Sequence, residues 1–475
     1  MRAELRRQWL LPVAVALAST SLNLHAASDA DRIRMLEEQL QRQKAAMEQQ
    51  QKMLEAMESE LQRLKTGQPL EERVISADES AVAAAQKEAH QAPSVEEPPE
   101  PVTLPNLEVY GFVMADAIYD FKRVDPDWND TLRVTTIPTQ DGFYGRDGEF
   151  VFSVRQSRLG VKSDIETDVG TFSALLEAEL FGVGGDAGQT TPRLRHAWVT
   201  WNDLGMGQYW SNFMDADVFP NTIDYWGPTG MVFYRNQQIR YSWQIGEDEF
   251  AISLEDPDTS LTVGRFRDDC IDINCGSTVD DVFQKYNDIP DLTMRWRNNT
   301  EWGHYQVAGI ARKLGFERLD TGQKDSEFGW GINTSTVINT WGQDKLKLQL
   351  VYGEGIGNYL NDGGLDIAPR KATATNNEAV AVPLLGIVAY YDHYWNEKWS
   401  SSFGWSTVRL DTTRGQGEDE FEDGSIAQVN LLHYPRKGVL MGGELAWGER
   451  NDISGADGYD VRVQFSLKVN FPLED

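Results

Sequence analysis

The sequence predicts an all-β transmembrane barrel of 16 antiparallel strands, with an N-terminal α-helical coiled coil. Residues between Asn106 and Phe471 alternate apolar and polar side chains in 16 segments. Long and short connections alternate along the chain, because every odd-numbered connection is long and every even-numbered one is short. Membrane barrels combine an even strand number with short periplasmic turns and long extracellular loops. A soluble sheet would also alternate, but it would not segregate its loop lengths in this way.

The expected strands follow from where the alternation begins and ends. They are 107–121, 149–163, 170–181, 192–202, 205–210, 237–245, 248–255, 290–299, 302–316, 326–340, 343–354, 383–395, 398–411, 424–434, 438–449 and 459–471. The long connections are then 122–148, 182–191, 211–236, 256–289, 317–325, 355–382, 412–423 and 450–458.

The last segment shows the alternation most clearly. One face carries Val461, Val463, Phe465, Leu467, Val469 and Phe471, and the other carries Arg462, Gln464, Ser466, Lys468 and Asn470. A closed barrel turns the apolar face to lipid and pairs every backbone group without leaving an edge. We therefore expect the polar face of each strand to line the lumen.

The overall polarity and the N-terminus agree with an exported barrel. The mean hydropathy is −0.48, and no apolar run approaches the roughly 20 residues of a transmembrane helix. Residues 1–26 read as a secretory signal peptide, because Arg2, Arg6 and Arg7 precede the apolar stretch from Leu10 to Ala18, with small residues at the predicted cleavage site.

A coiled coil is predicted for residues 27–66, followed by an acidic, Pro-rich linker at 67–105. The heptad core positions are Ile33, Leu36, Leu40, Gln43, Met47, Gln50, Leu54, Met57, Leu61 and Leu64. Polar residues at core positions serve register and oligomer state, so Gln43 and Gln50 are read in that role. The alternative is a long solvated helix.

The composition bounds the partners and cofactors. Cys270 and Cys275 are the only two cysteines, and in an oxidising compartment we expect them to form a local disulfide, since two sulfurs alone make a poor zinc site. No metal or other cofactor is expected. The net charge of −30 disfavours nucleic-acid binding, which requires basic patches.

The third long connection, 211–236, is long enough to fold back and narrow the lumen of a 16-stranded barrel. Rings of arginine or lysine select anions. Six cations are placed on the lumenal side as candidate solute ligands: Arg235, Arg240, Arg195, Arg295, Arg297 and Lys347. The alternative is that each cation pairs with a strand carboxylate or with a loop acid, namely Asp215, Asp217 or Asp224, and holds the constriction loop in place.

Two smaller features remain open at this point. Arg155 and Arg158 cannot both face inward on a regular strand, so one faces a subunit contact or a bulge intervenes. His196 and His393 fall on apolar faces near aromatic residues, where amphipathic rings favour the membrane boundary. The chain contains no GxSxG, HExxH or P-loop motif, and we do not expect an enzyme.

Several segments resemble the DcaP-like trimeric porins of Gram-negative outer membranes. They are VYGFVMADAIYDF (109–121), VRQSRLGVKSD (154–164), LRHAWVTW (194–201), the block from Gly207 to Trp243, and YGEGIGNYLND (352–362). The resemblance implies a homotrimer with a periplasmic coiled coil, a third loop folded into the barrel, and passive diffusion of small hydrophilic solutes that favours dicarboxylates or other anions. The chain departs from the family pattern at Met114, where a basic residue is expected, and in the Pro-Leu-Glu-Asp that follows Phe471.

The expected function is a porin in contact with outer-membrane lipid and lipopolysaccharide. One rival is a structural tether that uses the coiled coil to reach peptidoglycan or a periplasmic partner. The other rival is a barrel hydrolase, which would need a nucleophile and base at one rim. Hydrolysis assays and deletion of residues 27–105 would discriminate among the three.

Overall fold

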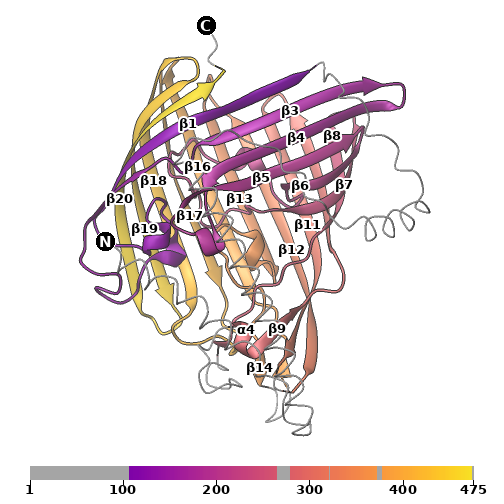
Figure 1. The fold of residues 1–475 in the computed structure, drawn as a ribbon, viewed down its shortest axis with the longest axis vertical. Helices are drawn as coiled ribbons and strands as arrows, with labels where there is room; N and C mark the ends of the chain where they lie inside the picture. The colour runs from indigo at the N-terminus through magenta and orange to yellow at the C-terminus, as the bar shows by residue number, and fades with distance from the viewer. Residues whose placement is uncertain (1–105, 265–278, 320, 372–376, 473–475) are drawn as a thin grey trace, which may run out of the picture. The chain divides into compact units, whose positions relative to one another are not determined.

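A computed structural model describes residues 106–264, 279–319, 321–371 and 377–472 (Figure 1). The predicted signal peptide, coiled coil, linker and cysteine pair lie outside these residues. Within the described part of the chain, no helix combines the length and apolar character needed to cross a membrane.

The described residues form one closed antiparallel barrel. Its strands are β1 (Leu107–Asp120), β2 (Glu149–Ser153), β3 (Arg158–Thr167), β4 (Gly170–Phe181), β5 (Thr190–Trp201), β6 (Leu204–Trp210), β7 (Arg235–Ile245), β8 (Asp248–Glu255), β9 (Phe283–Tyr286), β10 (Asp291–Thr300), β11 (Gly303–Arg318), β12 (Gln323–Asn339), β13 (Lys345–Glu354), β16 (Pro383–Asn396), β17 (Trp399–Leu410), β18 (Phe421–Arg436), β19 (Val439–Asp452) and β20 (Asp457–Phe471). Consecutive strands pair, and β1 pairs with β20 to close the barrel, with Gly111 opposite Phe471 and Asp120 opposite Arg462.

These elements amount to 16 barrel strands, as predicted, because two strands are interrupted. The first part of β1 pairs with β3 and its last part pairs with β2, so that β2 and β3 make a single strand. The segments β9 and β10 both pair with β11 and likewise make one strand. The short hairpin of β14 (Arg370–Lys371) and β15 (Asn377–Glu378) stands outside the barrel sheet.

Short helices occupy the long connections. They are η1 (Pro126–Trp128), η2 (Val134–Thr136), η3 (Gly184–Asp186), η4 (Ala216–Val218), α4 (Val279–Val282) and η6 (Gly357–Tyr359). In Figure 1 the arrowhead of β20 lies at one end of the barrel, and α4, β9 and β14 lie at the other. Two connections predicted to be long, 317–325 and 450–458, are shorter than expected, because β11, β12, β19 and β20 continue the ladder past their predicted ends.

The alternation places apolar side chains outside and polar side chains inside, as β20 shows. Val463, Phe465 and Leu467 are exposed on the outer surface, where lipid would lie, whereas Arg462, Gln464 and Ser466 are buried on the inside. The interior is not polar throughout. The loops 211–234 and 355–382 pack an apolar cluster against the inner faces of β11 to β17, including Phe213, Val232, Tyr359, Val388 and Val408. Part of the lumen is therefore filled by protein core.

Two irregularities redirect side chains that regular alternation would misplace. Residues 154–157 turn between β2 and β3, with the amide of Ser157 donating to the carbonyl of Val154 at 3.0 Å, and both Arg155 and Arg158 face inward as a result. A bulge in β5 inserts Arg195 opposite the β4 pair Glu177 and Ala178. His196 is consequently buried inside, 4.7 Å from the ring of Tyr209, and the expectation of a membrane-boundary role for it was wrong.

Candidate functional site in the barrel lumen

The connection 211–234, which we call the constriction loop, lies inside the barrel and is hydrogen-bonded to several strands. Near its start Asp215 accepts from Ser335 at 2.6 Å and hydrogen-bonds His304 at 2.8 Å. In its middle the amide of Ile223 donates to Glu444 at 2.9 Å. Toward its end the amide of Gly230 donates to Ser406 at 2.9 Å. These contacts involve β11, β12, β17 and β19, so the loop crosses the lumen.

Asp224 connects this loop to two other parts of the barrel. Its carboxylate accepts from the Leu132 amide at 3.0 Å and the Thr131 hydroxyl at 3.0 Å, both in the first long loop. It also pairs with Arg462 of β20 at 3.2 Å. Since all these groups are buried, Asp224 fixes the depth of the loop in the lumen.

A cavity of about 300 Å³ remains between this loop and the wall formed by β1, β3, β5, β6 and β20. We call it the lumenal cavity. Its wall side includes Phe112, Met114, Arg158, Arg195, Trp210 and Lys468, and its loop side includes Phe219, Asn221, Tyr225 and Phe233.

An excess of positive charge adjoins the lumenal cavity. Arg195 pairs with Glu177 at 2.7 Å and with Glu179 at 2.6 Å. Three further guanidinium groups lie within 4.0 Å of the same two carboxylates, namely Arg158, Arg193 and Arg235. Four guanidinium groups therefore share two carboxylates, and we call this set the arginine cluster. The buried Nε of Arg158 and Nη1 of Arg235 have no hydrogen-bond partner.

The six cations predicted from sequence all carry their side chains inward, but they do not form one ring. Arg195 and Arg235 belong to the arginine cluster. Arg240 is buried and donates to Gln238 and to the carbonyl of Trp210, and makes no ion pair with a carboxylate that the structure describes. Arg295 pairs with Glu249 of β8.

The remaining two predicted cations contact the constriction loop. Arg297 pairs with Asp217 at 2.6 Å and with Asp215 at 3.5 Å. Lys347 pairs with Asp392 at 3.1 Å and donates to the carbonyl of Phe219. These contacts hold the loop in place, which is the alternative that the sequence left open for each cation.

Sequence reasoning missed several cations that the structure brings to the lumen interior, among them Arg158, Arg193, Arg462 and Lys468. Arg462 and Lys468 were on the predicted polar face of the last strand, but alternation did not distinguish them from other polar residues. Arg158 was set aside because of its odd separation from Arg155. The turn at 154–157, signalled only by a break in the alternation, is what brings both arginines inward.

Asp215 and Asp217 at the start of the loop, together with His304 of β11, resemble two other kinds of site, a metal site and a hydrolase site. Ligand atoms of Asp215, Asp217 and His304 lie within 4.8 Å of one another, a spacing that suits a metal ion, but Arg297 already pairs with both carboxylates. Ser335 and His304 both bond to Oδ2 of Asp215. The carboxylate thus stands between the hydroxyl and the imidazole, an arrangement unlike the nucleophile–base contact of a serine hydrolase.

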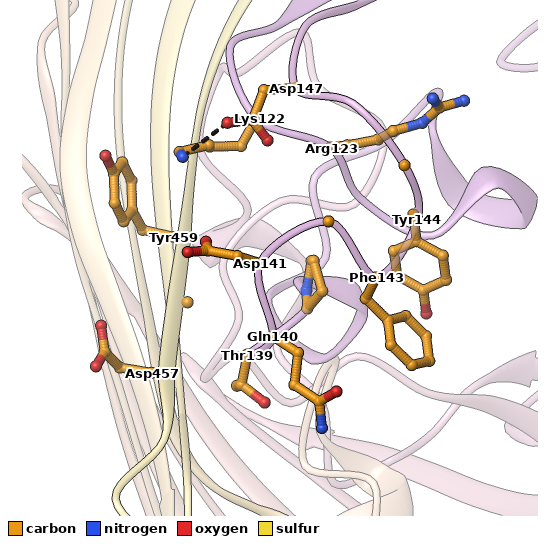
Figure 2. A pocket seen from close by; sticks show the side chains of 14 residues that line it. Lys122, Arg123, Thr139, Gln140, Asp141, Phe143, Tyr144, Asp147, Asp457 and Tyr459 are labelled. Atoms are coloured by element: carbon orange, nitrogen blue, oxygen red, sulfur yellow. Dashed lines mark hydrogen bonds and ion pairs between the residues drawn. The ribbon is translucent and has the colours of Figure 1, made fainter.

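A second cavity, of about 320 Å³, lies outside the lumen between the first long loop and the start of β20. Figure 2 shows Lys122 paired with Asp147, at 2.8 Å, beside Tyr459 and opposite Gln140, Asp141 and Phe143. These side chains are half-buried or exposed, and the cavity is separate from the arginine cluster.

Comparison with known proteins agrees with this architecture. The family model described as DcaP outer membrane protein matches residues 38–263. The outer membrane channel DcaP of Acinetobacter baumannii has 20% sequence identity and a TM-score of 0.64, covering 77% of this chain and 97% of its own. The in-vitro folded, trimer form of OmpT from Vibrio cholerae has 10% identity and a TM-score of 0.46, covering 77% of this chain and 99% of its own. No curated protein matches the sequence. The family match over residues 38–263 and the barrel fold agree with the resemblance to DcaP-like outer-membrane proteins that the sequence segments indicated.

Proposed function

We propose that the protein is an outer-membrane channel for passive diffusion of small hydrophilic solutes, with a preference for anions such as dicarboxylates. The observation that carries the anion preference is the excess of guanidinium groups over carboxylates beside the lumenal cavity. Lys468 adds a further positive charge at the same cavity, and no described carboxylate pairs with it. Cationic linings of this kind select anions.

The chain's net charge of −30 does not oppose this proposal. A permeant ion responds to charges within about a Debye length, roughly 8 Å in physiological salt. Many of the acids lie in the long connections, for example in 412–423, and their effect on an ion at the arginine cluster is screened. The charges that line the cavity therefore decide the selectivity.

The reversal potential of the reconstituted channel in a potassium chloride gradient tests the proposal. Arg158 and Lys468 are the best residues to change, because their side chains reach the cavity while Arg195 is buried in its ion pairs. The unmodified channel should favour chloride, and Arg158→Gln with Lys468→Gln should lower the chloride-to-potassium permeability ratio by roughly threefold or more.

Lys285→Gln is the matched control, since Lys285 carries the same charge but lies in an exposed pair with Asp258 outside the lumen. Cation preference in the unmodified channel would contradict the anion proposal. Liposome swelling with succinate, glucose and lysine would then rank the solutes, with succinate expected first.

We also propose a homotrimer whose predicted coiled coil lies in the periplasm. This proposal is supported by the heptad pattern at residues 31–65 and by the family resemblance. A tethering role for the coiled coil is compatible with a channel. Deleting residues 27–105 and measuring permeability and envelope integrity separately would distinguish the two roles.

A further inference from the structure

The lumenal cavity combines its cations with an aromatic surface. Trp210, Phe233 and Phe219 form a continuous row, with ring centroids 4.9 Å apart for Trp210 and Phe233 and 5.6 Å apart for Phe219 and Phe233. All three rings are only partly buried and line the cavity. Exposed aromatic faces inside an aqueous lumen are costly to hydrate, and they gain when an apolar surface covers them.

A fourth ring, that of Phe112, lies directly beside the cations on the opposite wall. The Nζ atom of Lys468 is 4.1 Å from the centroid of this ring, and the guanidinium carbon of Arg158 is 5.3 Å from it. Both distances are within the range of cation–π contact. An anion held by Lys468 and Arg158 would therefore touch Phe112 with the rest of its body.

Only a ligand that has both a negative charge and an apolar surface contacts the cations and the aromatic rings of the cavity at the same time. A chloride ion or a small dicarboxylate could pair with the cations, but it would leave the aromatic row exposed to water. A neutral aromatic molecule would cover the rings and leave Lys468 without a counter-charge. The volume of about 300 Å³ is ample for a single six-membered ring with a carboxylate, since a cavity of about 150 Å³ already admits benzene.

We propose that the lumenal cavity is a binding site for organic anions that carry one carboxylate on a flat apolar body, with aromatic monocarboxylates as the simplest case. The carboxylate pairs with Lys468 and Arg158, and the ring lies between Phe112 and the row of Trp210, Phe233 and Phe219. The inference rests on the proposed function of an anion channel, and it differs from the dicarboxylate preference because it names aromatic monocarboxylates as the anions that this cavity binds most strongly.

Current block in the reconstituted full-length protein tests this inference, with benzoate, acetate, succinate and benzyl alcohol as probes. Benzoate should interrupt the single-channel current at concentrations roughly tenfold below those required for acetate or succinate, a difference of about 1.4 kcal/mol. Benzyl alcohol, which has the ring without the charge, should produce no interruption. Equal potency of benzoate and acetate would overturn the proposal.

Two substitutions separate the ring contact from the charge contact. Phe112→Ser should bring the potency of benzoate down to that of acetate, and Lys468→Gln should weaken both. Phe143→Ser is the matched aromatic control, since Phe143 is 64% exposed in the outer cavity of Figure 2 and should not alter benzoate block. If Phe112→Ser does not assemble, calorimetric titration of the unmodified protein with benzoate, acetate and benzyl alcohol decides the question.

The failure of this inference can be distinguished from the failure of the proposed function. A chloride-selective channel on which benzoate acts no more strongly than acetate would retain the channel function and refute the aromatic site. A protein that assembles in bilayers but conducts no ions would refute the channel itself.

Discussion

Arg462 and Asp120 form a two-pronged ion pair across the seam where the last strand meets the first. Nε of Arg462 lies 2.6 Å from Oδ1 of Asp120, and Nη2 lies 2.7 Å from Oδ2. Both side chains are almost completely buried, and the two residues are also register partners in the β1–β20 ladder. The same guanidinium also pairs with Asp224 of the constriction loop. The Arg462 side chain therefore contributes both to the closure of the barrel and to the position of the loop.

Replacing Arg462 with Met should destabilise the barrel by about 3–5 kcal/mol, because it leaves the buried charge of Asp120 without a partner. Urea titration of the folded, heat-modifiable form on gels measures this loss. Lys122→Met is the control, since the Lys122–Asp147 pair is exposed to solvent, and it should leave the midpoint unchanged. A midpoint for Arg462→Met equal to that of the unmodified protein would contradict the assigned role of the seam pair.

The seam also shows what the sequence could and could not predict. Alternation in the last segment correctly placed Arg462 inside and Val463 outside, because side-chain direction in a strand depends only on local period. It could not name Asp120 as the partner, which lies 342 positions away and is brought close by closure of the barrel. Prediction of side-chain direction from the alternation also fails where the backbone of a strand is irregular. The bulge that turns His196 inward and the turn at 154–157 that admits Arg158 appear in the sequence only as breaks in the alternation, which do not tell which side chain turns inward.

Asp224→Ala should loosen the constriction loop while the barrel still assembles. The substitution removes four hydrogen bonds to a buried carboxylate, and each such charged bond contributes about 1.5–3 kcal/mol. Open-channel current noise should increase, and mean conductance should rise, as the constriction loop moves away from its position in the lumen. Asp186→Ala, at an exposed acid in the second long loop, should leave both quantities unchanged. Unaltered noise in the Asp224 variant would mean that other contacts fix the loop.

Replacing two of Ile33, Leu40, Leu54 and Leu61 with Asp should separate the predicted helices. Each buried leucine contributes roughly 1.5–3 kcal/mol, so two such changes exceed what a short coiled coil can lose. Crosslinking within residues 27–66 should disappear, while light scattering should still report a trimer held by the barrels. Conversion of the whole assembly to monomers would show that the helices supply the main contact.

Cys270 and Cys275 should resist alkylation until a reductant is added. A disulfide that closes so short a loop adds little to global stability, and Cys270→Ser should fold and conduct like the unmodified protein. Mass spectrometry after alkylation, with and without reductant, makes the measurement. Immediate labelling of both thiols in the oxidised protein would exclude the pair.

Asp215 should make the seating of the constriction loop sensitive to acid. Burial alone would raise the pKa of Asp215, but the hydrogen bonds from His304 and Ser335 and the charge of Arg297 hold that pKa below its usual value. A carboxyl whose pKa is depressed on folding stabilises the folded form above the unfolded pKa, which is about 3.9 for Asp. This stabilisation is lost as the pH falls from about 4 through the folded pKa.

Current noise from the loop should therefore stay constant from pH 7 to about pH 4 and increase below that value. Asp215→Asn should show the increased noise already at pH 7 and little further change on acidification, because its amide cannot provide the charged acceptor that His304 and Ser335 now share. Asp217→Asn is the neighbouring control, since the Asp217 side chain is 57% exposed, and it should retain the acid response. A response in Asp215→Asn as large as in the unmodified channel would assign the acid sensitivity to another group.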